Sequence, residues 1–187
     1  MPSNRDIARM LSFSEKVGAM GVSWDTKFVR DQGWKVAEEA FKELDKRGLG
    51  LKIGVQSDEA PYPNGETVAK MAAWNHFGTK KIPPRPYLTR AMDENTRRLE
   101  NFSAKIFKKI MDGENIERSL GLLGEEVVSV IRRMITTLNQ PPNAPSTIKK
   151  KGSSNPLIDT GRLRASQRWA IINKLGTTIM SSPKSSR

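Results

Sequence analysis

The chain of 187 residues has no cysteine and a single histidine, His76. Without cysteine it can form neither a disulfide framework nor a thiolate site. A single histidine nearly excludes histidine-based metal binding, and any Ser-His-Asp arrangement would have to use His76. No apolar run approaches the roughly 20 residues that a membrane-spanning helix needs. Residues 1–16 also lack the apolar segment of a signal peptide, so we expect a soluble protein made in a cytoplasm.

Charge is the strongest compositional feature. There are 32 lysine and arginine residues against 20 aspartate and glutamate residues, which gives a formal net charge of +12. Such an excess favours contact with nucleic acid, an acidic protein surface or an anionic membrane. We expect nucleic acid or an acidic protein and no membrane; the alternative is a solvated surface that happens to be basic.

The first third of the chain predicts a helix, a strand and a second helix after an N-terminal arm over 1–24. Apolar residues recur every three or four positions over 26–47, as in an amphipathic helix. Residues 49–56 alternate apolar with small or polar side chains, which is the period of a half-buried strand. A short helix is expected over 67–77, with Thr67 as its N-cap.

Two long amphipathic helices are predicted next, over 87–111 and 115–138. Asp112-Gly113 leaves only a short turn between them, so they should pack antiparallel as an αα-hairpin. With the preceding elements they make an α+β body over 25–138.

The remaining residues predict a linker and a β-hairpin. Residues 139–156 are rich in proline, asparagine, serine and lysine, a composition that favours a flexible basic linker, extended and mobile over 146–155. Strands are expected over 165–172 and 177–180, within a C-terminal region, 157–187, that completes the sheet. The predicted fold class is α+β, with a small antiparallel sheet packed against amphipathic helices.

A proline-rich corner joins the short helix to the αα-hairpin. Gly78 should end the helix, and Ile82-Pro83-Pro84-Arg85-Pro86 follows shortly after. Proline fixes its own φ and restrains the preceding residue, so we expect a rigid turn. His76 lies at the helix end with no second histidine nearby. This favours a partly exposed histidine stabilised by the helix dipole over a catalytic or metal-binding one.

Asp159-Thr160-Gly161 matches the local signature of an aspartic protease, in which two aspartates share a proton. Arg162 and Arg164 follow at once, and their charges would be costly to bury in such a site. The favoured alternative is that Asp159 or Thr160 caps a short turn. We therefore predict no catalytic residue, metal or cofactor, and no enzyme; a protease is a remote third interpretation.

Basic side chains gather at the corner and beyond the αα-hairpin. No helix-turn-helix, RNA-binding signature or interleaved aromatic platform accompanies them, so any contact with DNA should be to phosphates, without base readout. Contact with the DNA backbone or an acidic partner is expected for Lys80, Lys81, Lys149, Lys150, Lys151 and Arg164.

Two passages of the sequence carry a family resemblance. The first reads Ala72-Ala73-Trp74-Asn75-His76-Phe77-Gly78-Thr79, then Ile82-Pro83-Pro84-Arg85-Pro86-Tyr87-Leu88. The second reads Pro142-Asn143-Ala144-Pro145-Ser146-Thr147-Ile148, Lys151-Gly152, then Pro156-Leu157-Ile158-Asp159-Thr160-Gly161-Arg162-Leu163-Arg164. Together they resemble phage virion-morphogenesis proteins of the minor tail protein Z and tail-completion type. In that family Pro-x-Arg-Pro-aromatic follows a Phe-Gly pair, and a Lys-Gly arm precedes Pro-Leu-Ile-Asp-Thr-Gly.

The resemblance implies a non-enzymatic structural protein of a tailed phage or prophage, assembled in the bacterial cytoplasm and located in the virion tail or neck. The expected partners are further copies of the chain in a ring, the tail tube and the head connector or other neck proteins. Non-specific contact with DNA in the channel is also expected. The alternative function is a basic nucleic-acid-binding regulator or packaging factor. Subunit or partner contacts are expected for Phe77, Pro84, Arg85, Pro86, Tyr87, Asp159, Thr160, Gly161, Arg162 and Leu163.

Overall fold

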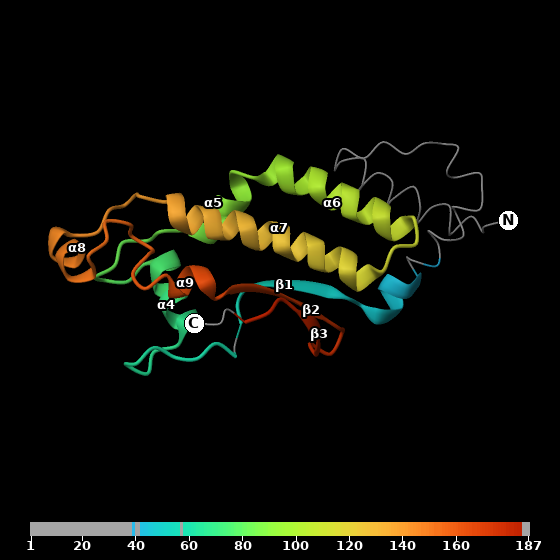
Figure 1. The fold of residues 1–187 in the computed structure, drawn as a ribbon, viewed down its shortest axis with the longest axis horizontal. Coiled ribbons are helices and arrows are strands. Elements are labelled where there is room, and N and C mark those ends of the chain that lie inside the picture. The colour runs from blue at the N-terminus through green and yellow to red at the C-terminus, as the bar shows by residue number, and fades with distance from the viewer. Residues whose placement is uncertain (1–38, 40–41, 57, 185–187) are drawn as a thin grey trace.

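The computed structural model describes residues 39, 42–56 and 58–184 (Figure 1). The expected arm over 1–24 and most of the expected helix over 26–47 lie outside the described residues. Residues 42–47 are helical, and Gly48 follows with a φ of 52°, donating its N–H to the Leu44 carbonyl at 2.9 Å. Glycine is favoured at such a left-handed helix end because it has no Cβ. The helix therefore ends where the sequence predicts.

One layer of the molecule is a three-stranded antiparallel sheet in the order β1-β2-β3. The strands are β1 (Gly50–Val55), β2 (Gln167–Ile172) and β3 (Thr178–Ser181). β2 is the central strand. It pairs with β1 so that Gly50 lies opposite Ile172 and Val55 lies opposite Gln167. All three expected strands are present. β2 begins two residues later than predicted because the residues before it are helical.

Helices α5 (Tyr87–Asp93), α6 (Thr96–Met111) and α7 (Ile116–Thr137) cover one face of the sheet. In Figure 1, α7 lies between the sheet and the pair α5 and α6, and α6 and α7 form an αα-hairpin. The α+β class and the αα-hairpin are confirmed.

The prediction of a single helix over 87–111 is wrong, because the helix is interrupted at residues 94–95, between α5 and α6. Asn95 donates its side-chain amide to the Ala91 carbonyl at 3.0 Å, and the Thr96 hydroxyl donates to the Met92 carbonyl at 3.0 Å. Short polar side chains that bond to nearby backbone in this way compete with the helical hydrogen bonds.

Helix α7 is buried on two faces because it lies between two layers. Leu120, Val130 and Met134 are buried, and their spacing is that of the apolar stripe of the amphipathic helix predicted over 115–138. The sequence interpretation missed a second set of buried residues: Ser119, Gly121, Gly124, Val128, Ile131 and Ile135. Members of both sets pack with Tyr87 and Ala91 of α5 or with Trp169 and Ile171 of β2.

Trp169 makes the closest contact between the sheet and α7. Its side chain is only 4% exposed, and its indole N–H donates to a carboxylate oxygen of Glu125 at 2.7 Å. A Cβ placed on Gly124 would lie 2.5 Å from Cγ of Trp169, and one on Gly121 would lie 3.1 Å from Cη2. The two glycines therefore leave a flat surface on α7 that accommodates the indole ring.

Three short helices gather at one end of the molecule, around the C-terminal half of α7 (Figure 1). They are α4 (Val68–Phe77), α8 (Pro145–Lys151) and α9 (Arg162–Ala165). The N-cap prediction for α4 is confirmed, since the Thr67 hydroxyl accepts from the Lys70 N–H at 3.2 Å.

Helix α8 corrects the expectation of an extended stretch over 146–155. Pro145 occupies its first helical position, where the missing N–H costs no hydrogen bond. Gly152 ends it with a φ of 70° and donates its N–H to the Ile148 carbonyl at 2.9 Å. Pro145 and Gly152 are the start and stop signals of a helix, but the polar composition between them favours an extended chain, and this led to the wrong prediction.

The substitution Gly124→Ala tests the contact between α7 and Trp169. Overpacking a core costs about 1–3 kcal/mol, which exceeds the roughly 1 kcal/mol that alanine gains over glycine in a helix. We therefore expect the free energy of unfolding, measured by urea denaturation, to fall by about 1 kcal/mol. Gly121→Ala, whose new Cβ meets only the far edge of the ring, should cost less. A Gly124→Ala protein as stable as wild type would contradict the close approach.

Candidate functional site

The proline-rich corner is folded tightly onto the end of α4. Gly78 ends the helix with a φ of 80°, and a Cβ there would lie 2.9 Å from the backbone nitrogen of Pro84. The Thr79 N–H donates to the Ile82 carbonyl at 2.8 Å, and the Arg85 N–H donates to the Asn75 carbonyl at 2.8 Å. Backbone hydrogen bonds thus add to the proline restraint in fixing this turn.

Arg85 connects the corner to the segment that follows α7. Its Nε donates to the Pro141 carbonyl at 2.9 Å, and its Nη2 donates to the Pro142 carbonyl at 3.2 Å and to Oδ1 of Asn143 at 3.1 Å. The side chain is only 3% exposed, and burial lowers the pKa of the Arg85 guanidinium from its ordinary value. Neutral oxygen atoms therefore satisfy a buried cation, and no carboxylate of the described residues pairs with it.

The expectation that Arg85, Tyr87 and Leu163 face a partner is corrected by their burial. Tyr87 is 1% exposed, and burial raises the pKa of its phenol to about 12. Leu163 lies in the same core cluster as Tyr87. These three side chains fix the local fold and leave no surface for a second molecule.

Other residues of the predicted interface do lie at the surface. Phe77, the last residue of α4, is 76% exposed, which is unusual for so large an apolar side chain. The remaining exposed members of the predicted set are Pro84, Pro86, Asp159 and Thr160. Gly161 has a φ of 77° and precedes the first residue of α9. The corner and the Asp-Thr-Gly turn thus supply the exposed part of the candidate interface.

Arg162, which follows the Asp-Thr-Gly turn, contacts the loop before α4. Its guanidinium lies 4.8 Å from the ring centroid of Tyr62 and donates to the Ala60 carbonyl. Such cation–π packing orients the guanidinium while its polar edge remains hydrogen-bonded.

Asp159 does not have the surroundings of a protease aspartate. Its side chain is exposed, whereas an aspartic protease holds two carboxylates close together so that they share a proton.

His76 is buried, which corrects the expectation of a partly exposed side chain. Its ring lies edge-on to Phe77 at 4.6 Å and to Tyr87 at 5.6 Å between centroids. Its Nε2 is 3.4 Å from the Thr89 hydroxyl, and its Nδ1 has no hydrogen-bond partner among the described residues. Burial lowers the pKa of His76 from its ordinary value of 6.5. Helix α5 covers the ring, and desolvation dominates any effect of the helix dipole.

The predicted basic contacts do not form one cluster. Lys80 and Lys81 are exposed at the corner, and Lys149 and Lys150 are exposed on α8. Lys151 is half-buried: its ammonium donates to the Asn155 carbonyl at 3.2 Å and to the Pro156 carbonyl at 3.4 Å, and burial lowers its pKa. Lys151 therefore supports the chain after α8 and is less available to a partner.

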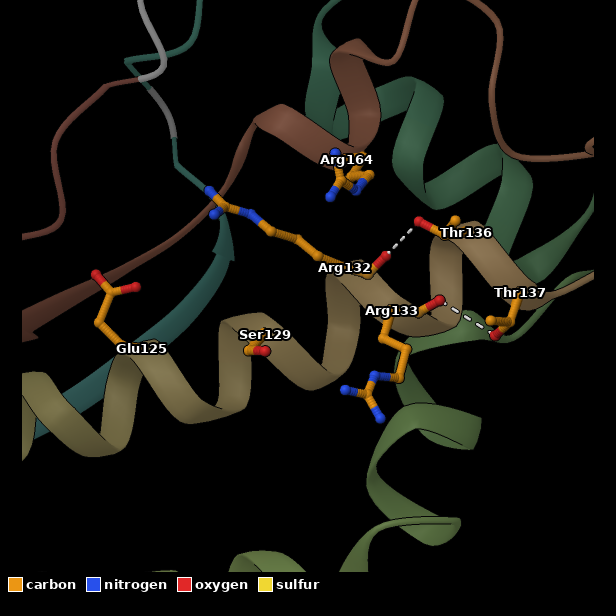
Figure 2. Close-up of a pocket in the computed structure, with 7 residues that line it drawn as sticks. All are labelled: Glu125, Ser129, Arg132, Arg133, Thr136, Thr137 and Arg164. Carbon is orange, nitrogen blue, oxygen red and sulfur yellow. Dashed lines mark hydrogen bonds between the residues drawn. The ribbon is translucent and has the colours of Figure 1, made fainter.

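Arg164 belongs to a separate feature, a pocket between α7 and α9 that we call the arginine pocket (Figure 2). Its cavity volume is about 450 Å³. Its lining residues are Glu125, Ser129, Arg132, Arg133, Thr136, Thr137 and Arg164. The sequence interpretation missed Arg132 and Arg133, although a polar stripe with helical spacing on α7 could have indicated them.

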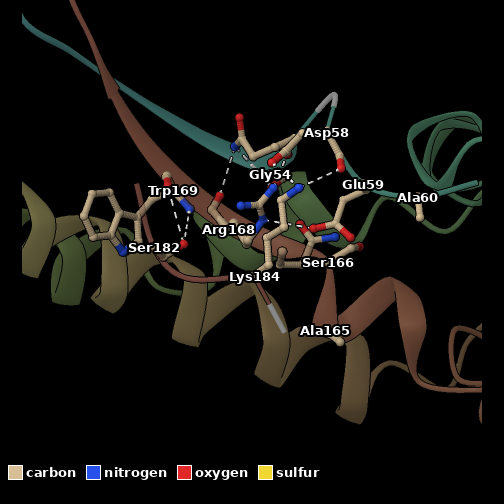
Figure 3. Close-up of polar contacts among 12 residues, drawn as sticks. Gly54, Asp58, Glu59, Ala60, Ala165, Ser166, Arg168, Trp169, Ser182 and Lys184 are labelled. Atoms are coloured by element: carbon tan, nitrogen blue, oxygen red, sulfur yellow. Dashed lines mark hydrogen bonds and ion pairs between the residues drawn. The ribbon is translucent and has the colours of Figure 1, made fainter. Parts of the chain in front are cut away.

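Arg168 is a basic residue that the fold neutralises internally. It alternates with Trp169 along β2, so its side chain leaves the sheet on the face opposite α7. Figure 3 shows Arg168 ion-paired with Asp58 and with Glu59, the latter at 2.9 Å, while Lys184 lies 3.0 Å from the other Asp58 oxygen. The Lys184 ammonium and the Arg168 guanidinium hold the pKa of Asp58 below its ordinary value.

Two kinds of feature are absent from the part of the chain that the structure describes. No group of three or more His, Cys, Asp or Glu side chains is arranged to hold a metal ion there. No helix in that part is both long and apolar enough to cross a membrane.

The substitution Arg85→Met tests the link between the corner and the segment after α7. It leaves three oxygen acceptors without their donor, so we expect the free energy of unfolding to fall by about 2–4 kcal/mol. Arg90→Met is the matched control, because Arg90 makes only an exposed pair with Glu94. Such pairs contribute roughly 0.5 kcal/mol or less. Equal losses for the two variants in urea denaturation would contradict the role given to Arg85.

The histidine predicts a pH dependence of stability. Since the pKa of His76 is lower in the folded chain than in the unfolded chain, the unfolded chain takes up the proton first as the pH falls. Stability that is present above pH 6.5 is then lost as the pH falls through the folded pKa. We expect His76→Gln to lose less stability than wild type between about pH 7.5 and pH 5.5 in urea denaturation. Parallel curves for the two proteins would show that His76 does not titrate in this way.

Comparisons of this chain with protein-family models, with curated proteins and with solved structures gave no match. Its function must therefore be inferred from its residues and their geometry.

Proposed function

We propose that the chain is a structural tail-completion or neck protein of a tailed phage, which joins or terminates the tail at the head–tail interface. The observation that supports this proposal best is the contact made by Arg85. Arg85 belongs to the first passage that resembles the family, and the residues that accept its hydrogen bonds include Pro142 and Asn143 of the second passage. Two passages more than fifty residues apart are thus parts of one folded unit.

Rigidity is the property that this unit would contribute to an assembly. A turn fixed by prolines, backbone hydrogen bonds and a buried guanidinium loses little conformational entropy when a partner binds to it. Phe77 is the residue on it best suited to anchor a partner, because an exposed aromatic ring buries a large area at an interface. Pro84, Pro86, Asp159 and Thr160 would surround the contact.

In such an assembly the partner would be a second copy of the chain, the tail tube or the head connector. A ring of copies would use head-to-tail interfaces that close by rotation. The protein would then reside in the virion and act without a cofactor or catalytic residue.

A second candidate function is a nucleic-acid-binding regulator or packaging factor. The net charge of +12 and the arginine pocket favour it. Tight binding of DNA by the free protein that weakens steeply with salt would support this candidate over a structural role.

Electron microscopy of phage particles tests the structural proposal directly. In particles made without this protein, we expect separate full heads and tails if it joins them, or abnormally long tails if it terminates them. Normal infectious particles in its absence would overturn the proposal.

A variant pair locates the interface in the same experiment. Phe77→Ser should fail to restore normal particles although the protein folds, because the anchor is lost. Leu175→Ser, which removes a side chain that is 88% exposed on the β2–β3 turn, should restore them. Restoration by both variants would exclude Phe77 as the anchor.

A further inference from the structure

The arginine pocket has an arrangement of charge that its own chain does not neutralise. Three guanidinium groups, those of Arg132, Arg133 and Arg164, line it from two helices (Figure 2). No described carboxylate forms an ion pair with any of them, in contrast to Arg168 and Arg98. A concentration of cations without counter-charge is a site for anions.

The one acidic residue of the pocket is committed elsewhere. A carboxylate oxygen of Glu125 accepts the indole N–H of Trp169 at 2.7 Å, so this group is held toward the sheet. In Figure 2 it lies at one end of the pocket, Arg133 and Arg164 lie farther along, and the Arg132 side chain extends between them. With three guanidiniums against one carboxylate, the lining of the pocket is positive.

Arg132 is positioned by the fold and retains an unused donor. Its Nη2 donates to the Gln167 carbonyl at 2.9 Å, which fixes the guanidinium beside the start of β2. Its Nε is buried and has no hydrogen-bond partner among the described residues. The Arg132 guanidinium is therefore held in place by the backbone while its charge has no carboxylate partner among the described residues.

The remaining lining groups leave the guanidiniums to bind an oxyanion, and phosphate is one that they suit. Thr136 and Thr137 donate their hydroxyls back to the carbonyls of Arg132 and Arg133, at 2.9 and 3.1 Å, which leaves the guanidiniums as the main donors. A guanidinium matches the geometry of a phosphate or a carboxylate in two parallel hydrogen bonds, so the shape of the pocket must decide between them.

The shape of the pocket distinguishes a nucleic-acid backbone from an acidic peptide. Its lining contains no large apolar side chain, and a protein partner would need an apolar pocket for its anchor residue. Most lining residues are exposed, and from Ser129 to Thr137 they extend along α7 for about 12 Å. An open, elongated, positive surface without aromatic residues suits a backbone read through its phosphates and not through its bases.

We infer that the arginine pocket binds phosphate groups of a nucleic-acid backbone, without sequence preference. This inference rests on the arginine pocket and not on Phe77 or the corner. It locates the DNA contact of the second candidate function, and a neck protein that contacts DNA in the channel could use the same pocket.

The test measures DNA binding by the full chain in fluorescence anisotropy. The probe is a 30-base-pair duplex of mixed sequence, titrated at several salt concentrations. Arg133→Gln combined with Arg164→Gln removes two pocket charges whose side chains make no hydrogen bond or ion pair with other described residues. Arg118→Gln combined with Lys52→Gln is the matched control, because both side chains are exposed, lie outside the pocket and carry the same charge.

The expected result is a difference between two variants of equal net charge. The pocket variant should bind the duplex about tenfold or more weakly, and its slope of log affinity against log salt should fall by roughly one to two. The control variant should bind nearly as wild type does. Circular dichroism and thermal unfolding show whether both variants keep the wild-type fold.

Three outcomes would overturn the inference. Equal losses in the two variants would mean that net charge alone attracts DNA. Absence of binding by wild type up to about 50 μM at low salt would mean that no backbone site exists. Tighter binding of polyglutamate than of duplex DNA, lost in the pocket variant alone, would assign the pocket to an acidic protein.

Discussion

The contact of Trp169 with the glycine surface of α7 is the constraint on which the layered fold depends. The central strand of the sheet carries the tryptophan, and the helix shared by all layers carries Gly121 and Gly124. Because the ring lies directly on the helix backbone, the spacing between sheet and helix is set by this one side chain. Its hydrogen bond to Glu125 then fixes the direction of the ring, and with it the register of β2 against α7.

Arg85 fixes the end of the molecule that holds α4, α8 and α9, as Trp169 fixes the contact between the sheet and α7. A buried cation surrounded by carbonyl oxygens is stable only in the arrangement that supplies all of its acceptors, so the corner and the chain after α7 must fold together. The exposed groups on that end, Phe77 above all, are consequently presented on a stiff support. The arginine pocket differs in kind, because its cations are left without counter-charges and can respond to another molecule.

The sequence was sufficient to predict the elements but not their mutual burial. Period-two alternation identified β1, and helical spacing identified the αα-hairpin, because each pattern depends only on neighbours along the chain. The two-sided burial of α7 could not be predicted from its apolar pattern, because Gly121 and Gly124 add no apolar side chain to that pattern although they pack against an indole ring. Arg85 was assigned to the surface because its acceptors are main-chain atoms, which leave no trace in side-chain patterns. In the sequence, Arg132 and Arg133 have the pattern of an ordinary solvated helix face. Only the fold shows that Arg164 of α9 lines the same pocket.

The order of the strands has a consequence for how the protein can be made. Gly50 of β1 pairs with Ile172 of β2, 122 positions later, and β1 has no other partner among the described strands. During synthesis the αα-hairpin leaves the ribosome with its sheet-facing side uncovered, and β1 must wait for a strand that is translated long after it. Pairing across such a separation closes a large loop and slows folding. The apolar residues of β1 therefore stay without their strand partner until residues 167–172 have been made, and apolar surface exposed in this way favours aggregation of the unfinished chain.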